Sequence, residues 1–449
     1  MQLQEAIKRL FYWAIQSVRA VARHLVGFLT SPHVTFLIGE PTFWLLGMRG
    51  RRRKNDLSQV KRVLVVRLDE IGDVVLTTPF LRELRRNLPN AWITLVVKPA
   101  VHNLVELCPY ANEVLTYDWS ISGVFAPLQR HWRVLRFAYC YLWPRHFDLA
   151  IVPRWDADYY HATYVAYFSG ARWRVGYSEN VDEHKQRLNG SFDRLFTHVL
   201  NDRTLRHEVE RNLEVIRCLG GGVQDQRMEL WVGDEDEAFA ESVLRESGIL
   251  PGEMVIGFGP SGGGSPLKTW PLNSFIELGC SLRRKYICRI LVFGGPGEEG
   301  LGWQIERAVG HAVINVVGKT TLRQMAALLE RCDLYVGNDS GPMHVAAAVG
   351  TPVVAIFGGS CHHRFGPWGN GDAVLSLALP CSPCFQMHHP DRCSRCIFDR
   401  PHCLVDITVA KVKEAIEARL SERKCSIARK RALEYADSLV RGADEKVDS

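Results

Sequence analysis

The sequence lacks an uncharged apolar run long enough to cross a membrane. The apolar positions near its amino terminus are interrupted by Lys8, Arg9, Arg19 and Arg23. A membrane-spanning helix needs about 18 to 20 consecutive, mostly apolar residues, and a secretory signal peptide needs an uncharged apolar core. We therefore expect this segment neither to span a bilayer nor to act as a signal peptide.

The body of the protein also lacks a strong charge of either sign. The whole chain carries a formal net charge of +6, and residues 1–54 alone carry +7, with nine Lys/Arg against two acids. Everything after residue 54 therefore sums to −1. A domain that binds nucleic acid carries its own basic face, so no nucleic-acid partner is expected.

The composition lacks the signs of disorder, and the length exceeds that of one ordinary domain. Hydrophobic residues make up 47% and charged residues 23% of the 449 positions, which is typical of a globular protein. We predict a leader over 1–57, a first domain over 58–222, a second domain over 223–420 and a basic helical tail over 421–449. The loose stretch 220–236 is the expected hinge.

The leader has the pattern of an amphipathic helix over 5–29. Its apolar positions recur at helical spacing: Leu10, Phe11, Ala14, Val18, Val21, Leu25 and Phe28. A second apolar run over 36–48 precedes five cations between Arg49 and Lys54. Apolar area and positive charge together favour binding to anionic lipid, so we predict an anionic membrane surface as a partner. The alternative is a helix packed on the protein's own surface.

Apolar, strand-like runs alternate with helical stretches through both domains. Such runs are typical of parallel strands buried on both faces, and they occur at 62–66, 93–97, 113–116, 147–152, 254–258, 289–293, 313–316, 333–336 and 352–357. The alternation predicts an α/β fold of two Rossmann-like, doubly wound domains that face a central cleft. Ligands bind at the carboxyl ends of the strands in such domains.

A working dinucleotide fingerprint is missing, although residues 257–262 match the letters G-x-G-x-x-G. In a true fingerprint the helix opens at the third glycine, whereas here residues 263–266 continue a loop. No acidic residue ends a strand about 20 residues later, so hydride transfer is poorly supported. We predict instead that Lys268, at the end of this loop, is the counter-charge of a diphosphate. The alternative is a solvated lysine.

The stretch Gly-Asn-Asp-Ser-Gly-Pro-Met-His at 337–344 lies between a strand-like run and a short helix. Free backbone N–H groups and the positive end of a helix dipole predict a phosphate site there. Asp339 would repel a phosphate and is better suited to accept hydrogen bonds from sugar hydroxyls. The predicted ligand is therefore a nucleotide-sugar. The alternative is an ordinary helix capped by Asp339 or Ser340.

Five of the 13 cysteines cluster in a Cys-rich segment over 381–403. Cys381, Cys384, Cys393 and Cys396 form two C-x-x-C pairs, a spacing that fits a tetrahedral zinc. Four thiolates leave no open position for chemistry, so such a zinc would be structural. The alternative is a loop of free thiols.

Four motifs taken together resemble the signatures of glycosyltransferase family nine, the family of the lipopolysaccharide heptosyltransferases. They lie at 63–84, 268–271, 293–299 and 337–344, in the family's order and spacing. The resemblance covers roughly residues 60–415. The leader and the tail lie outside it.

The resemblance implies a GT-B fold and an inverting, metal-independent glycosyltransferase without a catalytic cofactor. The implied donor is ADP-heptose, and the implied acceptor is a lipid-anchored core saccharide at the cytoplasmic face of the inner membrane. Asp73 corresponds to the catalytic base. The family's donor contacts fall on Lys268 and Thr269 for the diphosphate, on Glu298 or Glu299 for the nucleoside, and on Asp339, Ser340, Gly341 and His344 for sugar and phosphate.

Several alternatives stay open at this point. Asp73 is also well placed to cap the helix that follows it, and Asp69 and Glu70 compete for the role of base. The chain could be a GT-B enzyme with another nucleotide-sugar, or a non-catalytic, membrane-associated scaffold that binds nucleotides. The joint presence of Asp73 and Lys268 favours an enzyme, because a scaffold has no need of both.

Overall fold

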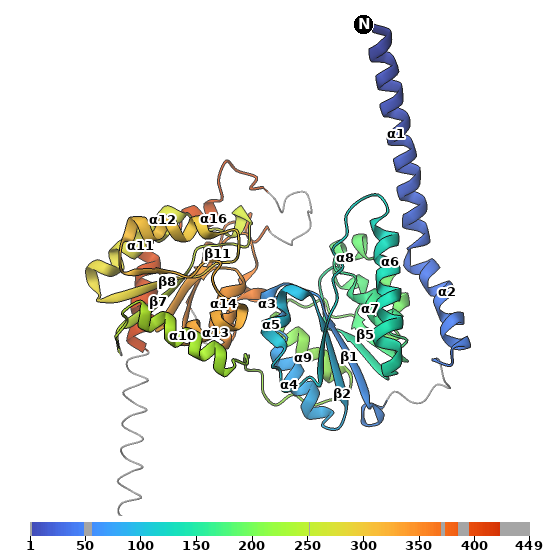
Figure 1. Cartoon of the computed structure of the whole chain (residues 1–449), viewed down its shortest axis with the longest axis horizontal. Helices are drawn as coiled ribbons and strands as arrows, with labels where there is room; N and C mark the ends of the chain where they lie inside the picture. Colours follow the sequence, from blue (N-terminus) through green and yellow to red (C-terminus); the bar gives the residue numbers. More distant parts are fainter. Residues whose placement is uncertain (1, 49–55, 251, 370–372, 385–394, 423–449) are drawn as a thin grey trace, which may run out of the picture. The chain divides into compact units, whose positions relative to one another are not determined.

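A computed structural model describes residues 2–48, 56–250, 252–369, 373–384 and 395–422. The chain divides into two compact units, Met1–Gln226 and Arg227–Ser449 (Figure 1). Three predicted features lie outside the described residues: the basic cluster between Arg49 and Lys54, Cys393 and nearly all of the tail helix.

The first unit contains a parallel sheet of six strands in the order β3-β2-β1-β4-β5-β6. The strands are β1 (Arg62–Arg67), β2 (Trp92–Val97), β3 (Glu113–Thr116), β4 (Leu149–Val152), β5 (Trp173–Tyr177) and β6 (His198–Leu200). The first four confirm the predicted runs. The sequence did not reveal β5 and β6, because β5 contains Arg174 and Gly176 and β6 is only three residues long.

Helices cover both faces of this sheet. They are α3 (Ile71–Val75), α4 (Thr78–Asn87), α5 (His102–Val105), α6 (Ala126–Phe137), α7 (Ala162–Phe168), α8 (Glu183–Leu188) and α9 (Glu208–Cys218). Two helices, α3 and α4, follow β1 in place of one continuous helix. Pro79 has no N–H for the carbonyl of Val75, and the hydroxyl of Thr78 donates to that carbonyl instead, at 2.9 Å.

The amino-terminal segment forms two helices, α1 (Gln2–Leu29) and α2 (Pro32–Leu45). Among the described residues, no helix is long and apolar enough to span a membrane. One side of α2 packs on the first unit, where the ring of Phe43 meets Tyr167 edge-on at 5.5 Å between centroids. A Cβ at Gly39 would collide with the same tyrosine. The second apolar run of the predicted leader is therefore partly built into the domain.

The second unit has the same strand order, β12-β11-β10-β7-β8-β9, and is also parallel. Its strands are β7 (Met254–Gly259), β8 (Cys288–Val292), β9 (Val313–Asn315), β10 (Leu334–Asn338), β11 (Val353–Phe357) and β12 (Ala373–Ser376). All but β12 confirm the prediction. In both units the first and fourth strands are neighbours, which makes this the point where strand order reverses and where ligands bind.

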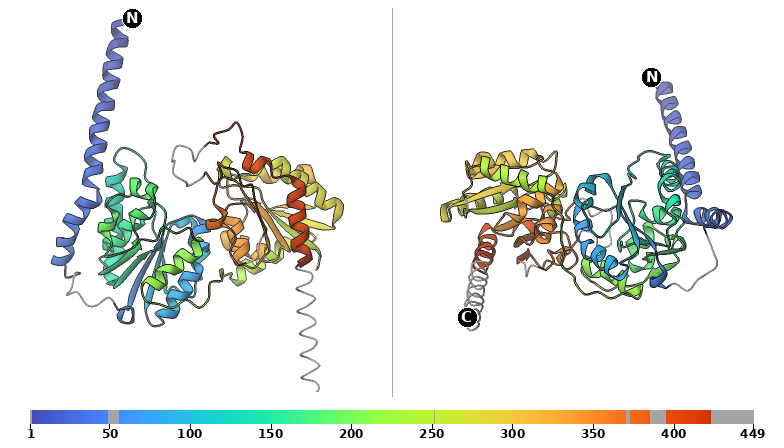
Figure 2. Two further views of the ribbon diagram at one scale, coloured as in Figure 1. Left: turned by 180° about the vertical axis from the view of Figure 1, so that it is seen from behind. Right: turned by 60° about the horizontal axis from the view of Figure 1, so that its bottom comes forward.

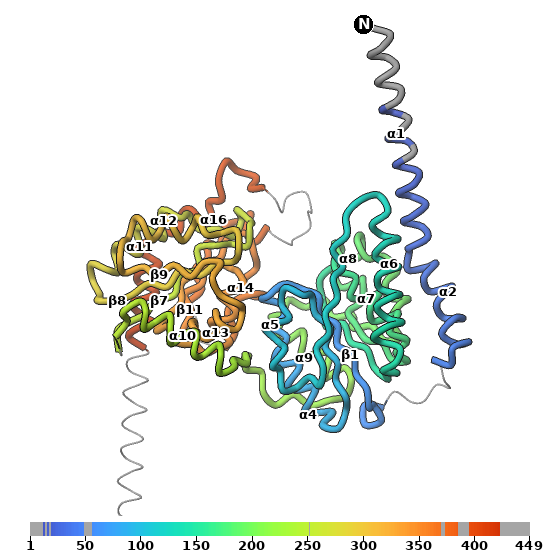
Figure 3. Tube along the Cα trace, in the orientation of Figure 1, coloured from blue at the N-terminus to red at the C-terminus, as the bar shows by residue number. Residues whose placement is uncertain are grey.

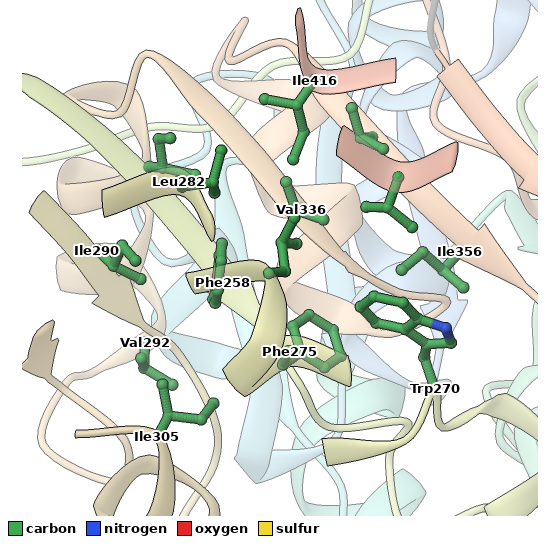
Figure 4. Close-up of a cluster of buried hydrophobic side chains, with 14 of the residues drawn as sticks. Phe258, Trp270, Phe275, Leu282, Ile290, Val292, Ile305, Val336, Ile356 and Ile416 are labelled. Carbon is green, nitrogen blue, oxygen red and sulfur yellow. The ribbon is translucent and has the colours of Figure 1, made fainter. Parts of the chain in front are cut away.

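The helices of the second unit surround one large apolar core. They are α10 (Asp234–Glu246), α11 (Leu272–Lys285), α12 (Glu299–Val309), α13 (Leu322–Glu330), α14 (Gly341–Ala348), α15 (His362–Phe365), α16 (His402–Val405) and a helix from 409 to at least 422. Figure 4 shows Trp270 and Phe275 side by side in this core, with ring centroids 5.0 Å apart. The indole N–H of Trp270 donates to the carbonyl of Ile407 at 2.9 Å, so the core anchors the chain that directly follows Lys268 and Thr269.

Short helical turns occur between these elements. They are Leu57–Gln59, Pro99–Val101, Ala138–Leu142, Trp143–Arg145, Glu179–Val181, Phe192–Leu195 and Pro266–Lys268.

Candidate active site

Asp69, at the carboxyl end of β1, is buried and fully engaged. Its side chain is 2% exposed, and its Oδ2 lies 2.9 Å from Nε of Arg67. Arg154, which follows β4, forms a second ion pair with it. A carboxylate held between two guanidinium groups and closed to solvent cannot reach a substrate hydroxyl. Asp69 therefore organises this edge of the sheet rather than serving as a base.

Glu70 is the N-cap residue of α3, and its side chain points to solvent. It is 61% exposed and forms an ion pair with Lys98. Its Oε1 also accepts a hydrogen bond from the hydroxyl of Tyr160 at 3.2 Å. These contacts hold Glu70 on the outside of the site.

Asp73 combines a fixed position with access to solvent. As the third residue of α3 it accepts a hydrogen bond from the backbone N–H of Glu70 at 3.3 Å, completing a capping box. Arg67 Nη2 lies 3.7 Å from Oδ1, and the side chain remains 25% exposed. Burial raises the pKa of Asp73 to about 6, against the opposing charge of Arg67. Capping and access to substrate thus coexist, and of the three acids Asp73 is the best suited to accept a proton near neutral pH.

In the second unit, Asp339 follows β10 and is 4% exposed. Its Oδ2 lies 2.8 Å from Nζ of Lys268, and its Oδ1 lies 3.9 Å from Nε2 of His344. Burial acts to raise the pKa of Asp339, but Lys268, His344 and the hydroxyl of Ser360 hold it below its ordinary value. The structure therefore brings together three of the residues predicted to bind the sugar donor, with the carboxylate of Asp339 between Lys268 and His344.

The loop that carries Lys268 and Thr269 is compact and is held by contacts within itself. The hydroxyl of Thr269 donates to the carbonyl of Ser265 at 2.8 Å. A Cβ at Gly262 would strike Thr269 and the backbone of Lys268, so only glycine fits there. Lys268 is 21% exposed, which leaves the ammonium group accessible to an anion.

Ser340 and Gly341 form the amino-terminal end of α14. Ser340 is the N-cap residue, but its hydroxyl accepts no hydrogen bond from the helix and donates to the carbonyl of Asn338 at 3.3 Å. Ser340 and Gly341 are partly exposed, whereas His344, one turn later, is buried. The backbone N–H of Gly341 is thus available to an anion. Pro342 has no N–H, and the N–H of Met343 donates to the carbonyl of Ser340 at 3.1 Å.

Glu298 and Glu299 lie after β8, and both carboxylates are tied to the local loop. Glu298 accepts hydrogen bonds from the hydroxyl of Ser261 and from the backbone N–H of Gly295, the latter at 2.8 Å. Glu299 accepts the N–H of Gly297 at 3.0 Å. Both side chains remain partly exposed, so contact with a nucleoside stays a prediction for each.

The glycines at 257 and 259 have a structural explanation. The ring of Tyr335 lies over the sheet beside them, and a Cβ at Gly259 or Gly337 would overlap its hydroxyl. Register pairs Tyr335 with Gly257 and Gly337 with Gly259 across β10 and β7. The G-x-G letters therefore make room for an aromatic ring, in agreement with the rejection of a dinucleotide fingerprint.

Asn338 is a site residue whose role the sequence did not reveal. It is fully buried. Its Oδ1 accepts the backbone N–H of Trp270 at 3.0 Å, and its Nδ2 donates to the carbonyl of Pro260 at 2.8 Å. One side chain thus ties both ends of the Lys268 loop to β10. In the sequence, only its position directly before Asp339 indicated that it belongs to the site.

Four cysteines line one cavity of about 770 Å³ in the second unit: Cys381, Cys384, Cys396 and Cys403. Burial raises the pKa of Cys403 to about 11, and the other three thiols add to the effect. The thiol chemistry suits zinc, yet within the described residues no three His, Cys, Asp or Glu side chains are arranged to hold a metal ion. The zinc remains a prediction, with Cys403 as a candidate ligand that the C-x-x-C spacing missed.

The sequence pattern of glycosyltransferase family 9 (heptosyltransferase) matches residues 145–394, more than half of the chain. The chain belongs to this family. Lipopolysaccharide heptosyltransferase 2 of Escherichia coli is 25% identical to it over 378 residues, covering 81% of this chain and 99% of the relative. Lipooligosaccharide heptosyltransferase 2 of Campylobacter jejuni is 31% identical over 171 residues, covering 37% of this chain. That match spans only 51% of the Campylobacter protein.

Solved structures of family-9 proteins share the fold. A family-9 glycosyltransferase of Veillonella parvula superposes with a TM-score of 0.67 at 25% identity, covering 82% of this chain and 98% of that one. The E. coli ADP-heptose heptosyltransferase II superposes with a TM-score of 0.62 at 22% identity, covering 81% and 99%. These likenesses confirm the predicted GT-B class with its two Rossmann-like sheets.

Proposed function

We propose that this chain is an inverting glycosyltransferase that moves heptose from ADP-heptose to a saccharide of the lipopolysaccharide core type. Its relatives are named for that transfer, and E. coli heptosyltransferase structures of the same fold have been solved with ADP and with an ADP-heptose analogue. The single observation that carries the proposal is Asp73. Its side chain is accessible to solvent and is held by the backbone N–H of Glu70, and burial raises the pKa of Asp73 to about 6.

In the reaction, a hydroxyl oxygen of the acceptor attacks the anomeric carbon of the donor from the face opposite ADP. The new C–O bond forms as the bond to the ADP phosphate oxygen breaks, and the hydroxyl proton passes to the carboxylate of Asp73. Such proton transfer contributes about 10²- to 10⁴-fold to a rate. One carboxylate is sufficient, because direct displacement with inversion requires no nucleophile from the protein.

The second unit holds the leaving ADP. Lys268 supplies a positive charge, and the amino-terminal end of α14, with the N–H of Gly341, adds the partial charge of the helix terminus. Asp339 beneath Lys268 fixes the direction of the ammonium group. We assign contacts with the phosphate groups to Thr269 and Ser340, and contact with the nucleoside to Glu298 or Glu299. We assign no catalytic cofactor.

We also propose that the enzyme works as a peripheral protein on the cytoplasmic face of the inner membrane. The acceptor is a lipid-linked saccharide, and the amino-terminal segment combines apolar residues with a charge of +7 over residues 1–54. Each cation near an anionic surface contributes about 1 kcal/mol of attraction.

A donor screen on the purified protein tests the transfer. Nucleoside diphosphate release is measured for a panel of nucleotide-sugars with a delipidated core saccharide. Release of ADP from ADP-heptose alone supports the proposal. Preference for another donor would keep the fold and change the substrate, and release from no donor would favour the non-catalytic scaffold.

A further inference from the structure

Helix α2 is apolar on two opposite sides, but the protein covers only one of them. Gly39 and Phe43 face the first unit and are buried. The opposite side is exposed and apolar, and consists of Leu37 (70%), Ile38 (65%), Trp44 (68%) and Leu45 (76%). A helix that is hydrophobic all round requires a second apolar environment, and nothing in the described residues supplies one.

The position of α2 is fixed by specific contacts, so its outer side is presented rigidly. Thr35 Oγ1 is hydrogen-bonded to Nε2 of His131 on α6 at 3.1 Å. Glu40 forms an ion pair with Arg174 of β5, with 3.1 Å between Oε1 and Nη2. Glu40 is the only carboxylate of α2, and because it is neutralised inward it adds no negative charge to the outer side.

Helix α6 carries a second exposed apolar stripe. Its inner side buries Ala126, His131, Val134 and Phe137. Its outer side, continued into the turn Ala138–Leu142, exposes Phe125 (55%), Leu128 (45%), Trp132 (71%) and Tyr139 (68%). These positions recur at helical spacing, where an ordinary surface helix has polar residues.

The charge around this stripe is mainly positive. Between Asp118 and Asp148 the sequence has four arginines and no acid. Arg133 pairs with Asp118 and Arg145 pairs with Glu113, whereas Arg136 is exposed on the outer side of α6. Helix α1 lies beside α6 and leads into α2 (Figures 1, 2 and 3). It adds exposed Val21 (69%), Leu25 (58%) and Phe28 (65%), together with exposed Arg19 and Arg23.

We propose that the outer sides of α1, α2 and α6 form one lipid-binding face, by which the first unit lies on an anionic bilayer. Aromatic and aliphatic side chains enter the interface while arginines meet the lipid head groups. The inference rests on the proposed function, which requires access to a lipid-linked acceptor, and it adds the surface that provides this access. It also assigns α6, within the catalytic domain, to membrane contact.

Co-sedimentation of the full-length protein with vesicles tests the face. Vesicles of phosphatidylcholine are compared with vesicles that also contain phosphatidylglycerol. We expect binding to the anionic vesicles, and Trp44→Glu with Leu45→Glu should lower it by about tenfold or more, as should Trp132→Glu. Trp303→Glu is the matched control, because Trp303 is 62% exposed in the second unit, and it should bind as the wild type does.

Two further measurements separate the possible failures. Thermal unfolding shows that each variant is folded, and ADP release with a soluble acceptor tests the transfer without a membrane. Normal transfer with undiminished vesicle binding by the Trp44 and Trp132 variants would overturn the lipid-binding face. If neither the wild type nor any variant transfers the sugar, but the Trp44 and Trp132 variants lose vesicle binding, the proposed function is overturned and the lipid-binding face is supported. A wild-type dimer that Trp44→Glu dissociates would show that a second copy covers the face, and would also overturn it.

Discussion

The ammonium group of Lys268 lies 2.8 Å from Oδ2 of Asp339, a carboxylate that is only 4% exposed. Lys268 comes from the loop after β7, and Asp339 comes from the turn between β10 and α14. Strands β7 and β10 are neighbours in the sheet, so the pair stands where strand order reverses. The pairing makes Asp339 a positioning residue for the lysine, in addition to any contact it makes with a sugar.

The pairing predicts that Lys268→Ala and Asp339→Ala weaken ADP binding together. Without Asp339 the lysine loses its fixed direction, so the double variant should bind ADP about as weakly as Lys268→Ala alone. Calorimetry with ADP measures this. Lys285→Ala is the control, because its pair with Glu417 lies on the surface of the same unit and such pairs contribute little. Additive losses would show that the two residues act independently.

The raised pKa of Asp73 predicts the pH dependence of turnover. The base must be ionised to accept a proton, and burial raises its pKa to about 6. The value of kcat/KM should therefore fall as pH drops through about 6. A profile that stays flat between about pH 5 and 8 would assign the base to another group.

The same shift predicts that Asp73→Asn stabilises the fold at high pH. The ordinary pKa of the carboxyl is 3.8, so the folded state holds the proton more tightly than the unfolded chain does. Stability from this group is present below about pH 4 and is lost as pH rises through about 6. At pH 8 the variant should therefore be more stable by about 1 to 3 kcal/mol, and at pH 4 the two proteins should be equal. Urea unfolding at both pH values measures the difference. Equal stability at pH 8 would contradict the shift.

Metal analysis tests the cysteine cluster. We predict one zinc per chain, lost in Cys403→Ser because Cys403 lines the same cavity as Cys381, Cys384 and Cys396. Cys218→Ser is the control, since Cys218 is exposed in the first unit. Zinc retained by Cys403→Ser would indicate that Cys393, and not Cys403, is the fourth zinc ligand. Wild-type protein without zinc would show that the segment is a loop of free thiols.

The sequence predicted the central strands well but missed two of the four edge strands, β6 and β12. Strands such as β1 and β10 are buried on both faces and read as unbroken apolar runs. The edge strands β6 and β12 are short and partly exposed, so their sequences carry no such signal. Strand β5, which lies between β4 and β6, was also missed. It contains a buried arginine whose partners come from elsewhere in the chain.

The candidate site was predictable where residues follow a strand directly. Asp73, Lys268 and Asp339 carry charges next to strand ends, where ligands bind in α/β sheets. Arg154 acts through its ion pair with Asp69, which lies 85 positions earlier in the chain. Asn338 acts through its hydrogen bond with Trp270, which lies 68 positions earlier. Sequence spacing cannot show such pairs. The apolar run 36–48 was interpreted as part of a lipid-binding leader, and its sequence did not show that Tyr167 and His131 contact one side of α2.

Release of ADP from ADP-heptose by Asp73→Asn and by Asp236→Asn tests the central claim most directly. Asp236 caps α10 in the same manner as Asp73 caps α3, accepting the N–H of Gly233 at 3.1 Å, and it also pairs with an arginine. The two variants thus lose similar structural contacts, but only Asp73 is proposed to accept a proton. We predict that Asp73→Asn lowers turnover by about 10²- to 10⁴-fold while Asp236→Asn retains it. Comparable turnover by the two variants would contradict the assignment of Asp73 as the base.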